Sequence, residues 1–370
     1  MAWVVPVELE EAVYSAARRA LGEAAFATSA LTKAIVDRSQ RYTSDRGRIA
    51  SDRTGDLAAR AVFFTIADAM KLAVPVAELA NRGALPAARP LRIVDLGAGC
   101  GAMTLGLVAS VSAIALDVQA IDHDAAALAI AAAAIRDFAA RRGVTVSLST
   151  RTGDITRAAL PAADLVLIGT VLNELPPEAA LALVERALAA IGDDGAVIVI
   201  EPALRDTSRA LHTIRDSIIA SGAGHVFAPC TRLGAPCPTL ADPSDWCHED
   251  RALRLSPRTA ELARHTHLRD SGMKFAYLVL RKHPVELADR EQSWRIVSAP
   301  MPAKGKLELI GCSAHGRVPL RLLKRNRAAG NREVERADRG DVLVIDQPAD
   351  EERVEITGDT KVTRIDPSRT

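Results

Sequence analysis

The sequence predicts an α/β protein built around a mainly parallel sheet that helices cover on both faces. Two observations lead to this fold class. From Leu91 onward, short apolar runs alternate with stretches of helical spacing, as strands and helices do around a parallel sheet. The first of these runs, LRIVDL, ends in the glycine-rich turn GAGCGA, after which a helix is expected from about Ala102.

The elements are expected in a fixed order along the chain. Residues 1–85 have the pattern of helices, except for an arginine-rich loop with the sequence RSQRYTSDRGRIASDRTGD. Strands are expected at LRIVDLGAG, VQAIDHD, VSLSTRTGD, ADLVLIGTVLNEL and GAVIVIEP, and the helix LALVERALAAIG separates the last two. A further helix, RDTSRALHTIRDSIIASG, leads to the cysteines. KFAYLVLRK and KLELIGC are expected to close the same sheet as neighbouring strands.

Three regions follow from this order. We expect an N-terminal helical region at 1–88 and an α/β domain at 89–302. A cysteine-rich insertion at 226–250 is expected before the sixth strand of that domain, KFAYLVLRK. Residues 303–370 are expected to hold a C-terminal strand, a basic segment and an acidic tail.

Composition narrows the class of protein. The formal net charge is +1, so overall charge does not mark a nucleic-acid binder. No apolar run reaches the roughly 18 residues of a membrane span. The first residues, MAWVVPVELEEAV, have no basic flank or cleavage site, so no signal or transit peptide is expected. We therefore expect a reducing, cytoplasmic (bacterial) location, in which clustered cysteines are more often metal ligands than disulfides.

The turn VDLGAGCG is the most informative local motif. Asp95 lies at the end of a buried strand, and Gly97, Gly99 and Gly101 permit a tight turn into a helix. Glycines at these positions let the backbone approach a ligand that a Cβ atom would obstruct. Cys100, within the turn, is expected to be a small residue that faces this ligand.

Three aspartates favour S-adenosylmethionine as the ligand, and with it a class I (Rossmann-like) methyltransferase fold. Asp95 would face the ammonium of the methionine part, whereas it would face a pyrophosphate unfavourably. Asp122 ends the second strand, where it can accept both ribose hydroxyls, and Asp154 can meet the adenine amino group. Two alternatives stay open: a dinucleotide, since GAGCGA fits G-x-G-x-x-A, and a glycine turn of another α/β protein with surface aspartates.

The sequence after the fourth strand, GTVLNELPPE, is where methyltransferases often hold catalytic groups. Asn173 and Glu174 are therefore the candidate catalytic residues. Enzymes that methylate base amines commonly have an aromatic residue here to stack the base, and this stretch has none. As an alternative, Asn173 caps a helix and Glu174 is an ordinary neighbour. Alignment alone can support methyl transfer, so the missing aromatic residue does not exclude an enzyme.

Four cysteines form a candidate metal site. Cys230, Cys237 and Cys247 lie in the insertion, and Cys312 ends the strand KLELIGC. Because that strand is expected beside KFAYLVLRK, to which the insertion leads, the four thiolates could converge at one edge of the sheet. Such a set suits either tetrahedral zinc or an iron–sulfur cluster.

The spacing of these cysteines leaves both metals open. Structural zinc sites usually contain Cys-x-x-Cys pairs, which this segment lacks, and longer spacings beside prolines suit a larger cluster. His248 and His315 could replace thiolates, which keeps zinc possible. The remaining alternative is a set of buried cysteines without a metal, although proline-rich loops rarely bury thiols for packing alone.

With these motifs in place, the sequence resembles a known family, the methyltransferase-like assembly proteins of the mitochondrial small ribosomal subunit and their bacterial relatives. The resemblance covers roughly residues 38–340 and includes RSQRYTSDR, VDLGAGCGAMTLGL, DLVLIGTVLNEL and VIVIEP. It continues through HVFAPCTRLGAPCP, DWCHED, KFAYLVLRK and LIGCSAHGR, and the cysteine series is its most specific part. It implies a class I methyltransferase fold, a role with small-subunit rRNA, and a 4Fe–4S cluster on Cys230, Cys237, Cys247 and Cys312.

Two segments depart from the family pattern. The family commonly has Trp-Gly-Asp where this chain has RGD at 339–341. It usually continues with glycines after EP, where this chain has ALR at 203–205. The resemblance therefore says less about the C-terminal tail and about the loop beyond the fifth strand.

The run RVPLRLLKRNRAAGNRE is a candidate RNA-binding segment. Clustered cations give phosphate affinity that does not depend on sequence. Charge runs are more often solvated faces, and this one has no aromatic residues for base stacking, but the resemblance favours RNA. Within eleven residues it contains Arg317, Arg321, Lys324, Arg325 and Arg327.

Two functions are therefore expected from different classes. One is an S-adenosylmethionine-dependent rRNA methyltransferase. The other is a non-catalytic assembly factor that binds the small subunit, in which the pocket is idle and the metal site is structural or a sensor. In either case we expect the small ribosomal subunit and its rRNA as partners, no membrane, and a monomer off the ribosome.

Overall fold

The structure is a computed structural model that describes residues 2–44, 52–112, 114–232, 236–269, 272–288, 292–346 and 352–368. The chain forms two compact units, each made of segments that are separated in sequence. The first unit comprises Met1–Ala73, Ala87–Val171 and Arg251–Met273. The second comprises Val74–Pro86, Leu172–Asp250 and Lys274–Thr370. The glycine turn thus belongs to the first unit and the four clustered cysteines to the second.

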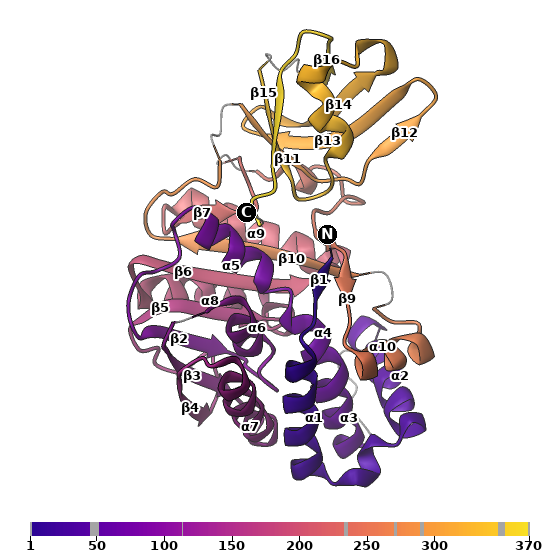
Figure 1. Ribbon diagram of the computed structural model, residues 1–370. Helices are drawn as coiled ribbons and strands as arrows, with labels where there is room; N and C mark the ends of the chain where they lie inside the picture. Colours follow the sequence, from indigo (N-terminus) through magenta and orange to yellow (C-terminus); the bar gives the residue numbers. More distant parts are fainter. Residues whose placement is uncertain are drawn as a thin grey trace. The chain divides into compact units, whose positions relative to one another are not determined.

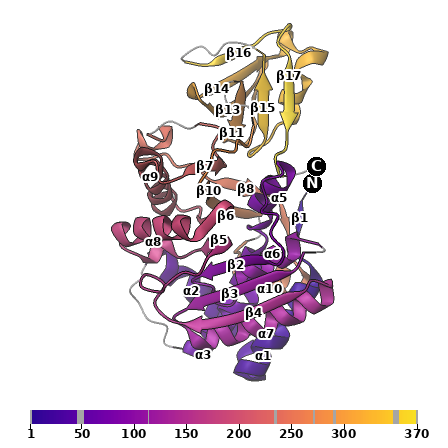
Figure 2. The same cartoon turned by 90° about the vertical axis from the view of Figure 1, so that its left-hand side faces the viewer.

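The first unit contains four parallel strands in the order β4-β3-β2-β5 (Figure 2). Their bounds are β2 (Leu91–Leu96), β3 (Leu116–Asp122), β4 (Val146–Thr152) and β5 (Ala163–Gly169). β2 and β5 are almost wholly buried, as expected for strands that are covered on both faces. Because parallel strands end at the same edge of a sheet, the segments that follow them gather at this edge.

Helices pack against these strands and against one another. α6 (Ala102–Ser110) follows β2, α7 (Ala125–Arg142) follows β3, and α1 (Val7–Leu21) packs on α7 (Figure 1). The other elements of the unit are η1 (Glu23–Phe26), α2 (Thr28–Ser44), α3 (Arg53–Ala59), the π-helical segment η2 (Arg60–Thr65), α4 (Ile66–Ala69), α10 (Pro257–Thr266), and the paired strands β1 (Trp3–Val4) and β9 (Leu253–Arg254).

A buried carboxylate explains why a distant segment belongs to this unit. Glu10 of α1 accepts hydrogen bonds from the Thr259 N–H (2.7 Å) and from the Ser256 hydroxyl (2.6 Å). These donors lie at the N-terminus of α10, where backbone N–H groups have no partner within the helix. Glu10 therefore ties α10 to α1.

The arginine-rich loop predicted at 38–56 is helical at both of its described ends. α2 and α3 enter it from both sides, while residues 45–51 lie outside the described residues. Asp56 gives the physical reason, because it pairs with Arg38 (2.7 Å) and with Arg41. The prediction of a loop was wrong here, since a helix face whose charges pair with another helix has the same composition as a polar loop.

The second unit contains an antiparallel group of strands in the order β6-β10-β7, and β8 also pairs with β10. Their bounds are β6 (Ile191–Pro202), β7 (His225–Ala228), β8 (Glu249–Arg251) and β10 (Met273–Arg281). The helices of this part are α5 (Ala73–Asn81), η3 (Leu172–Glu174), α8 (Pro177–Ala190), α9 (Arg205–Ser221) and η4 (Pro238–Leu240). The alternation of strands and helices confirms the predicted class, a mixed α/β fold with a Rossmann-like parallel sheet and N-terminal helices.

The cysteine segment lies ahead of β10, the strand KFAYLVLRK, as predicted. A short strand that the sequence analysis did not identify, β7, precedes the segment and pairs with β10. Among the described residues, no helix has the length and apolar character needed to cross a membrane.

A separate sheet forms the C-terminal part of the second unit. Its strands are ordered β16-β14-β13-β11-β15-β17, and β12 pairs with β13. The bounds are β11 (Ser293–Ile296), β12 (Met301–Ala303), β13 (Lys306–Ser313), β14 (Gly316–Leu323), β15 (Val342–Ile345), β16 (Val354–Ile356) and β17 (Val362–Ile365), with η5 (Lys324–Asn326) and η6 (Ala329–Arg336). Ordered strands therefore continue through the stretch that reads as an acidic tail.

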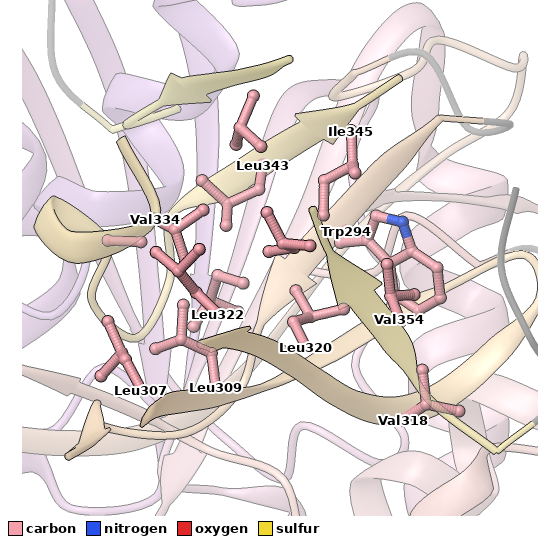
Figure 3. Close-up of a cluster of buried hydrophobic side chains, with 14 residues drawn as sticks. Trp294, Leu307, Leu309, Val318, Leu320, Leu322, Val334, Leu343, Ile345 and Val354 are labelled. Atoms are coloured by element: carbon pink, nitrogen blue, oxygen red, sulfur yellow. The ribbon is translucent and has the colours of Figure 1, made fainter. Parts of the chain in front are cut away.

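This sheet has a core of its own around Trp294 (Figure 3). Leu309, Leu320 and Val354 from neighbouring strands are buried with it. Gly311 is required by this packing, since a Cβ there would lie 2.9 Å from the Trp294 ring and 2.9 Å from Leu320.

The structure corrects the position of the strand KLELIGC. It was expected beside KFAYLVLRK, but as β13 it pairs with β11, β12 and β14 in the C-terminal sheet. The reason is visible in its pattern, because its residues are alternately buried and partly exposed. Such alternation is typical of a strand with one covered face, whereas KFAYLVLRK is buried almost throughout.

Candidate functional site

The glycine turn has the close approaches that its sequence predicts. Gly97 and Gly99 have φ values of 69° and 53°, a region that glycine enters without strain. A Cβ on Gly97 would lie 2.3 Å from the Val171 side chain, and a Cβ on Gly99 would lie 2.3 Å from a guanidinium nitrogen of Arg60. The turn is therefore packed so tightly that only glycine fits at these two positions.

Asp95 is a completely buried carboxylate behind this turn. Its Oδ2 accepts hydrogen bonds from the Thr104 hydroxyl (2.6 Å) and backbone N–H (3.2 Å). Its Oδ1 has no hydrogen-bond partner among the described residues. Burial, helped by the charge of Asp122, raises the pKa of Asp95 to about 6 despite the Thr104 hydrogen bonds. An acceptor left without a donor in this way fits a cationic or hydrogen-bond-donating ligand group.

Asp122 is also buried, and it braces the turn. Its Oδ2 accepts from the Gly99 N–H (2.8 Å), and its Oδ1 accepts from the Asp124 N–H (2.8 Å). Each carboxylate oxygen has a second lone pair, so these bonds leave acceptor capacity for hydroxyl groups of a ligand.

Asp154 lies in the segment that follows β4, next to Asp122. The Gly153 N–H donates to the Asp122 carbonyl (3.0 Å), which brings these two strand ends together. The Asp154 side chain is 57% exposed and accepts from the Thr156 N–H (2.8 Å) and hydroxyl (2.7 Å). The structure thus gathers Asp95, the glycines, Asp122 and Asp154 at one edge of the sheet, while their roles toward a ligand stay predictions.

The predicted catalytic pair lies in η3, beside a glutamate that the sequence analysis did not single out. Glu201, buried at the end of β6, accepts from the Asn173 side-chain amide (2.6 Å) and from the Leu172 N–H (2.9 Å). Glu174 is exposed. The signal for Glu201 was an acidic residue directly after the apolar run VIVI, where a buried charge needs partners.

The four cysteines converge on one cavity in the second unit. Cys230, Cys237, Cys247 and Cys312 all line a cavity of about 40 Å³. A cavity needs roughly 10–15 Å³ to hold a single water, so this cavity is larger than one water requires. The convergence arises although β13 belongs to the C-terminal sheet and not to the sheet for which it was predicted.

The pKa of two of these thiols is raised by burial and by the other cysteines. Burial raises the pKa of Cys247 well above its ordinary value, and charge on the other three cysteines raises it further. Burial likewise raises the pKa of Cys312 to about 12, with added contributions from Cys230 and Cys237. A cation at the centre would reverse this effect, because coordinated thiols lose their protons.

Two arginines and Glu249 line this cavity. Cys312 is flanked in the sheet by Arg295 on β11 and Arg317 on β14, and both line the cavity. Arg215 is almost completely buried, and charge on Cys230 and Cys237 contributes to its raised pKa. Arg215 also pairs with Asp216.

Arg295 and Arg317 differ in how they are held. Arg295 is buried and donates to Glu78 (3.0 Å) and Glu249 (2.8 Å), so its guanidinium is neutralised by protein carboxylates. Arg317 pairs with Asp245 through Nη1, while its buried Nε has no hydrogen-bond partner among the described residues. Arg317 therefore has a donor that is available to a group in the cavity.

The two histidines proposed as alternative ligands are placed differently. His248 lines the cavity, and burial lowers its pKa to about 4, so it is neutral as a metal ligand must be. Its backbone carbonyl accepts from Arg339 (3.0 Å), within the RGD sequence that departs from the family pattern. His315 instead lies against the Trp294 ring, at 6.2 Å between ring centroids. Within the described ranges, no group of three or more His, Cys, Asp or Glu residues is arranged to hold a single metal ion.

Cys100 lies in the first unit, apart from the four clustered cysteines. It is buried within the glycine turn, and burial raises its pKa to about 11, although the charges of Arg60 and Arg38 oppose this. It is therefore a neutral thiol, in keeping with the prediction of a small residue in this turn.

The basic run divides into paired and unpaired cations. Arg321 pairs with Glu308 (2.8 Å) and Glu355 (3.1 Å), Arg327 pairs with Glu335 (3.0 Å), and Arg317 pairs with Asp245. Lys324 and Arg325 are exposed, and the described residues offer them no ion pair. The sequence pattern could not separate these two groups, because the acidic partners are distant in the chain.

Among solved structures, the chain is similar to several methyltransferases. One is magnesium protoporphyrin IX methyltransferase (ChlM) from Synechocystis PCC 6803 with bound SAH, at 14% identity and a TM-score of 0.38, over 67% of this chain and 93% of that one. Another is the plantazolicin methyltransferase BpumL in complex with SAH, at 11% and 0.38, over 69% and 96%. A third is ribosomal protein L11 methylase from Lactobacillus delbrueckii subsp. bulgaricus, at 16% and 0.32, over 57% and 79%. These likenesses are distant, and the fold assignment rests on the strand order itself.

The family match is more extensive. A search of curated proteins gave no match. A family model described as mitochondrial small ribosomal subunit Rsm22 matches residues 62–344, well over half of the chain, and this range includes the glycine turn and all four clustered cysteines. The chain therefore belongs to the Rsm22 family.

Proposed function

We propose that this protein binds S-adenosylmethionine at the glycine turn and acts as a methyltransferase on the rRNA of the small ribosomal subunit. The buried Asp95 carboxylate, with one oxygen lacking a donor, carries this proposal. When bound, S-adenosylmethionine supplies a methyl group activated by a sulfonium sulfur. Asp95 would hold the ammonium of the methionine part, Asp122 the ribose hydroxyls and Asp154 the adenine amino group, with the glycines allowing close approach.

The residues after β5 would act on the methyl acceptor. Asn173 donates its side-chain N–H to Glu201, and its carbonyl oxygen would be the atom that accepts from an N–H or O–H group of the methyl acceptor. Glu174 is exposed and could accept the proton that the acceptor loses. Positioning of the two reactants supplies the rest of the rate enhancement.

The test compares rRNA methylation in three strains: unmodified, deleted for this protein, and carrying Asp95→Ala. The proposal predicts that one methyl mark on small-subunit rRNA is lost in both altered strains. Asp117→Ala, which removes an exposed carboxylate on β3, is the matched control and should keep the mark. An unchanged set of marks in the deletion strain would contradict the enzyme.

A specific observation favours a second candidate, a non-catalytic assembly factor. Asn173 is held by Glu201, and no aromatic side chain occurs between Gly169 and Pro177 to stack a base. The deletion strain would then accumulate immature small subunits, whereas the Asp95→Ala strain would not. If all methyl marks also persist, this result would support assembly as the protein's only role.

We also propose that Cys230, Cys237, Cys247 and Cys312 bind a 4Fe–4S cluster, with zinc as the alternative. Three observations support a cluster: four sulfurs around one cavity, a cavity larger than one small group, and arginines suited to an anionic occupant. Iron, sulfide and zinc analysis of protein purified without oxygen tests this. About four irons and four sulfides per chain would support the cluster, whereas one zinc without sulfide would replace it.

Lys324 and Arg325 are the proposed phosphate contacts for rRNA. Replacing both with Gln should weaken binding to small-subunit rRNA and reduce its salt dependence by the loss of about two phosphate contacts. Arg321→Gln with Arg327→Gln removes the same charge from paired positions and should change binding less. Equal effects of the two double variants would contradict this assignment.

We place the protein in the cytoplasm as a monomer off the ribosome. Sedimentation of the purified chain would check the monomeric state.

A further inference from the structure

The C-terminal sheet carries an open pocket that neither the cofactor proposal nor the metal proposal uses. Gly305, Leu323, Lys324 and Arg325 line this pocket, which has a volume of about 570 Å³. Pockets that bind small ligands usually measure about 300–1,000 Å³, so the space is large enough for one nucleotide. Its lining combines an apolar side chain with two cations.

A tight turn and a backbone hydrogen bond build this pocket from two separate stretches of the chain. Lys304 and Gly305 join β12 to β13, and Gly305 has a φ of 80°, which glycine adopts without strain. The Lys324 N–H, at the start of η5, donates to the Gly305 carbonyl (2.8 Å). This hydrogen bond holds the β12–β13 turn against η5, so Lys304 adds a third cation beside the pocket.

These three cations are available to a ligand. Lys304, Lys324 and Arg325 are exposed, and the described residues offer them no ion pair. Glu308, on the neighbouring strand β13, is already paired with Lys306 (2.6 Å), so it does not offset their charge. The pocket therefore attracts anionic groups.

Leu323 and Met301 provide apolar surface on the same face of the sheet. Leu322 points into the core (Figure 3), so its neighbour Leu323 lies on the opposite, partly exposed face. Leu323 is paired with Lys306 and Met301 with Glu308, and directly opposed residues of antiparallel strands share a face. Met301 is 42% exposed, so apolar side chains meet solvent beside the cations.

An unpaired nucleotide fits this arrangement better than a duplex or an acidic peptide does. Proteins that bind single strands combine cations along the phosphate backbone with side chains against which the bases pack. In duplex RNA the bases are stacked and paired, so none of them can enter a pocket. An acidic peptide would use the cations and leave Leu323 and Met301 without a contact.

We propose that this pocket binds an unpaired nucleotide of RNA. Leu323 would lie against the base or ribose, and Lys304, Lys324 and Arg325 would contact the adjoining phosphates. The inference rests on the proposed RNA binding. It goes beyond it in naming the pocket, an unpaired nucleotide as the occupant, and Lys304 as a further contact.

Fluorescence anisotropy tests the charged part of the pocket. The full chain is titrated with a single-stranded RNA of about ten nucleotides and with an RNA duplex of about 16 base pairs, each at several salt concentrations. Lys304→Gln should weaken single-strand binding about twofold to fivefold. It should also reduce the slope of log affinity against log salt by about 0.7, as for one lost phosphate contact. Lys33→Gln, which removes an exposed lysine of α2 in the first unit, is the matched control and should change neither value.

Leu323→Ala tests the apolar part with the same two RNAs. It should weaken single-strand binding about threefold or more, because apolar contact with the nucleotide is lost. The salt slope should stay unchanged, since no charge is removed. Binding of the duplex should also stay unchanged. Val7→Ala, at an exposed apolar residue of α1, is the matched control and should leave all of these values as in the unmodified protein.

The inference requires the effects of both Lys304→Gln and Leu323→Ala. It is overturned if either variant binds the single strand as the unmodified protein does, or if Leu323→Ala weakens both RNAs equally. An oligoglutamate peptide that binds as tightly as the single strand, and is weakened by the same two variants, would make this an acidic-peptide site instead. If replacing Lys324 and Arg325 weakens RNA binding while these two variants do not, the proposed phosphate contacts stand and only the inference fails. If the unmodified chain binds no RNA, both fail.

Discussion

The glycine turn of the first unit and the cysteine cavity of the second both bury ionisable groups, but in different electrostatic surroundings. At the turn, buried carboxylates surround the candidate ligand position, and burial raises the pKa of Asp95. At the cavity, buried thiols raise one another's pKa, and arginines surround them. The first site thus fits a ligand with a cationic group, whereas at the second, burial and neighbouring cysteines raise the pKa of Cys247 and Cys312. Each set of groups is costly to ionise until its ligand is bound.

The largest effect is expected at the cavity. Cys312→Ser should remove nearly all bound metal and lower the melting temperature, because metal binding and local folding are coupled. Cys100→Ser is the matched control, since that thiol is buried in the other unit. Metal content per chain and thermal unfolding of both variants check this. Full metal content in Cys312→Ser would show that Cys312 is not a ligand, so that β13 has no part in the metal site.

The next effect is expected at the turn. Asp95→Asn keeps the shape of the side chain but removes its charge, so affinity for S-adenosylhomocysteine should fall about tenfold to a hundredfold. Affinity of the unmodified protein should also fall below about pH 6, because the ammonium requires an ionised Asp95. Calorimetry from pH 5 to 8 measures both effects. An affinity that is independent of pH, or equal in the variant, would show that Asp95 does not contact the cofactor.

A third effect concerns the free protein. The raised pKa of Asp95, about 6 in the folded state against 3.8 ordinarily, means that the unfolded chain ionises this group first as pH rises. Protonation of Asp95 in the folded state adds to the free energy of unfolding. This contribution is fully present below about pH 4 and is lost as pH rises through 6. Asp95→Asn should therefore stabilise the ligand-free protein by up to about 3 kcal/mol above pH 6 and by little near pH 4. Urea midpoints across this range measure the effect, with Asp117→Asn as a control at an exposed aspartate. A difference between Asp95→Asn and the unmodified protein that does not change with pH would contradict it.

The smallest effect is expected from the available donor at the cavity. If iron is bound, Arg317→Gln should lower the reduction potential by roughly 40–80 mV, which corresponds to about 1–2 kcal/mol for a one-electron couple. The physical reason is that a nearby cation stabilises the more negative, reduced cluster. Arg321→Gln, whose arginine is paired with Glu308 and Glu355, should leave the potential unchanged. Identical potentials in all three proteins would place Arg317 outside the cluster's surroundings.

The glycine turn was easier to predict from sequence than the cysteine cavity, because its residues are close together in the chain. Asp95 and the glycines lie within one strand and turn, so residue type and spacing define the geometry directly. Arg60 was missed because it reaches the turn from another helical segment. Glu201 was missed for a similar reason, since its partners in η3 come from a different part of the chain.

The four cysteines line one cavity, but Cys312 comes from a different sheet than the one predicted. β13 is alternately buried and partly exposed, as in a strand with one covered face, whereas β10 is buried almost throughout. The C-terminal sheet was not predicted because most of its strands have only three or four residues and charged residues interrupt β14. Those charges form pairs such as Arg321 with Glu355, which join residues far apart in sequence and cannot be read from either segment alone.

The position of Cys312 on β13 also has a topological consequence. A group bound to both Cys247 and Cys312 closes a chain loop of roughly 65 residues, and this loop contains Arg251–Met273, the third segment of the first unit. For a covalent link of that span, restricting the unfolded chain contributes about 4 kcal/mol. Loss of the bound group would release this restriction for α10 as well as for the cysteine segment. Folding of the first unit would then depend on a group that the second unit holds.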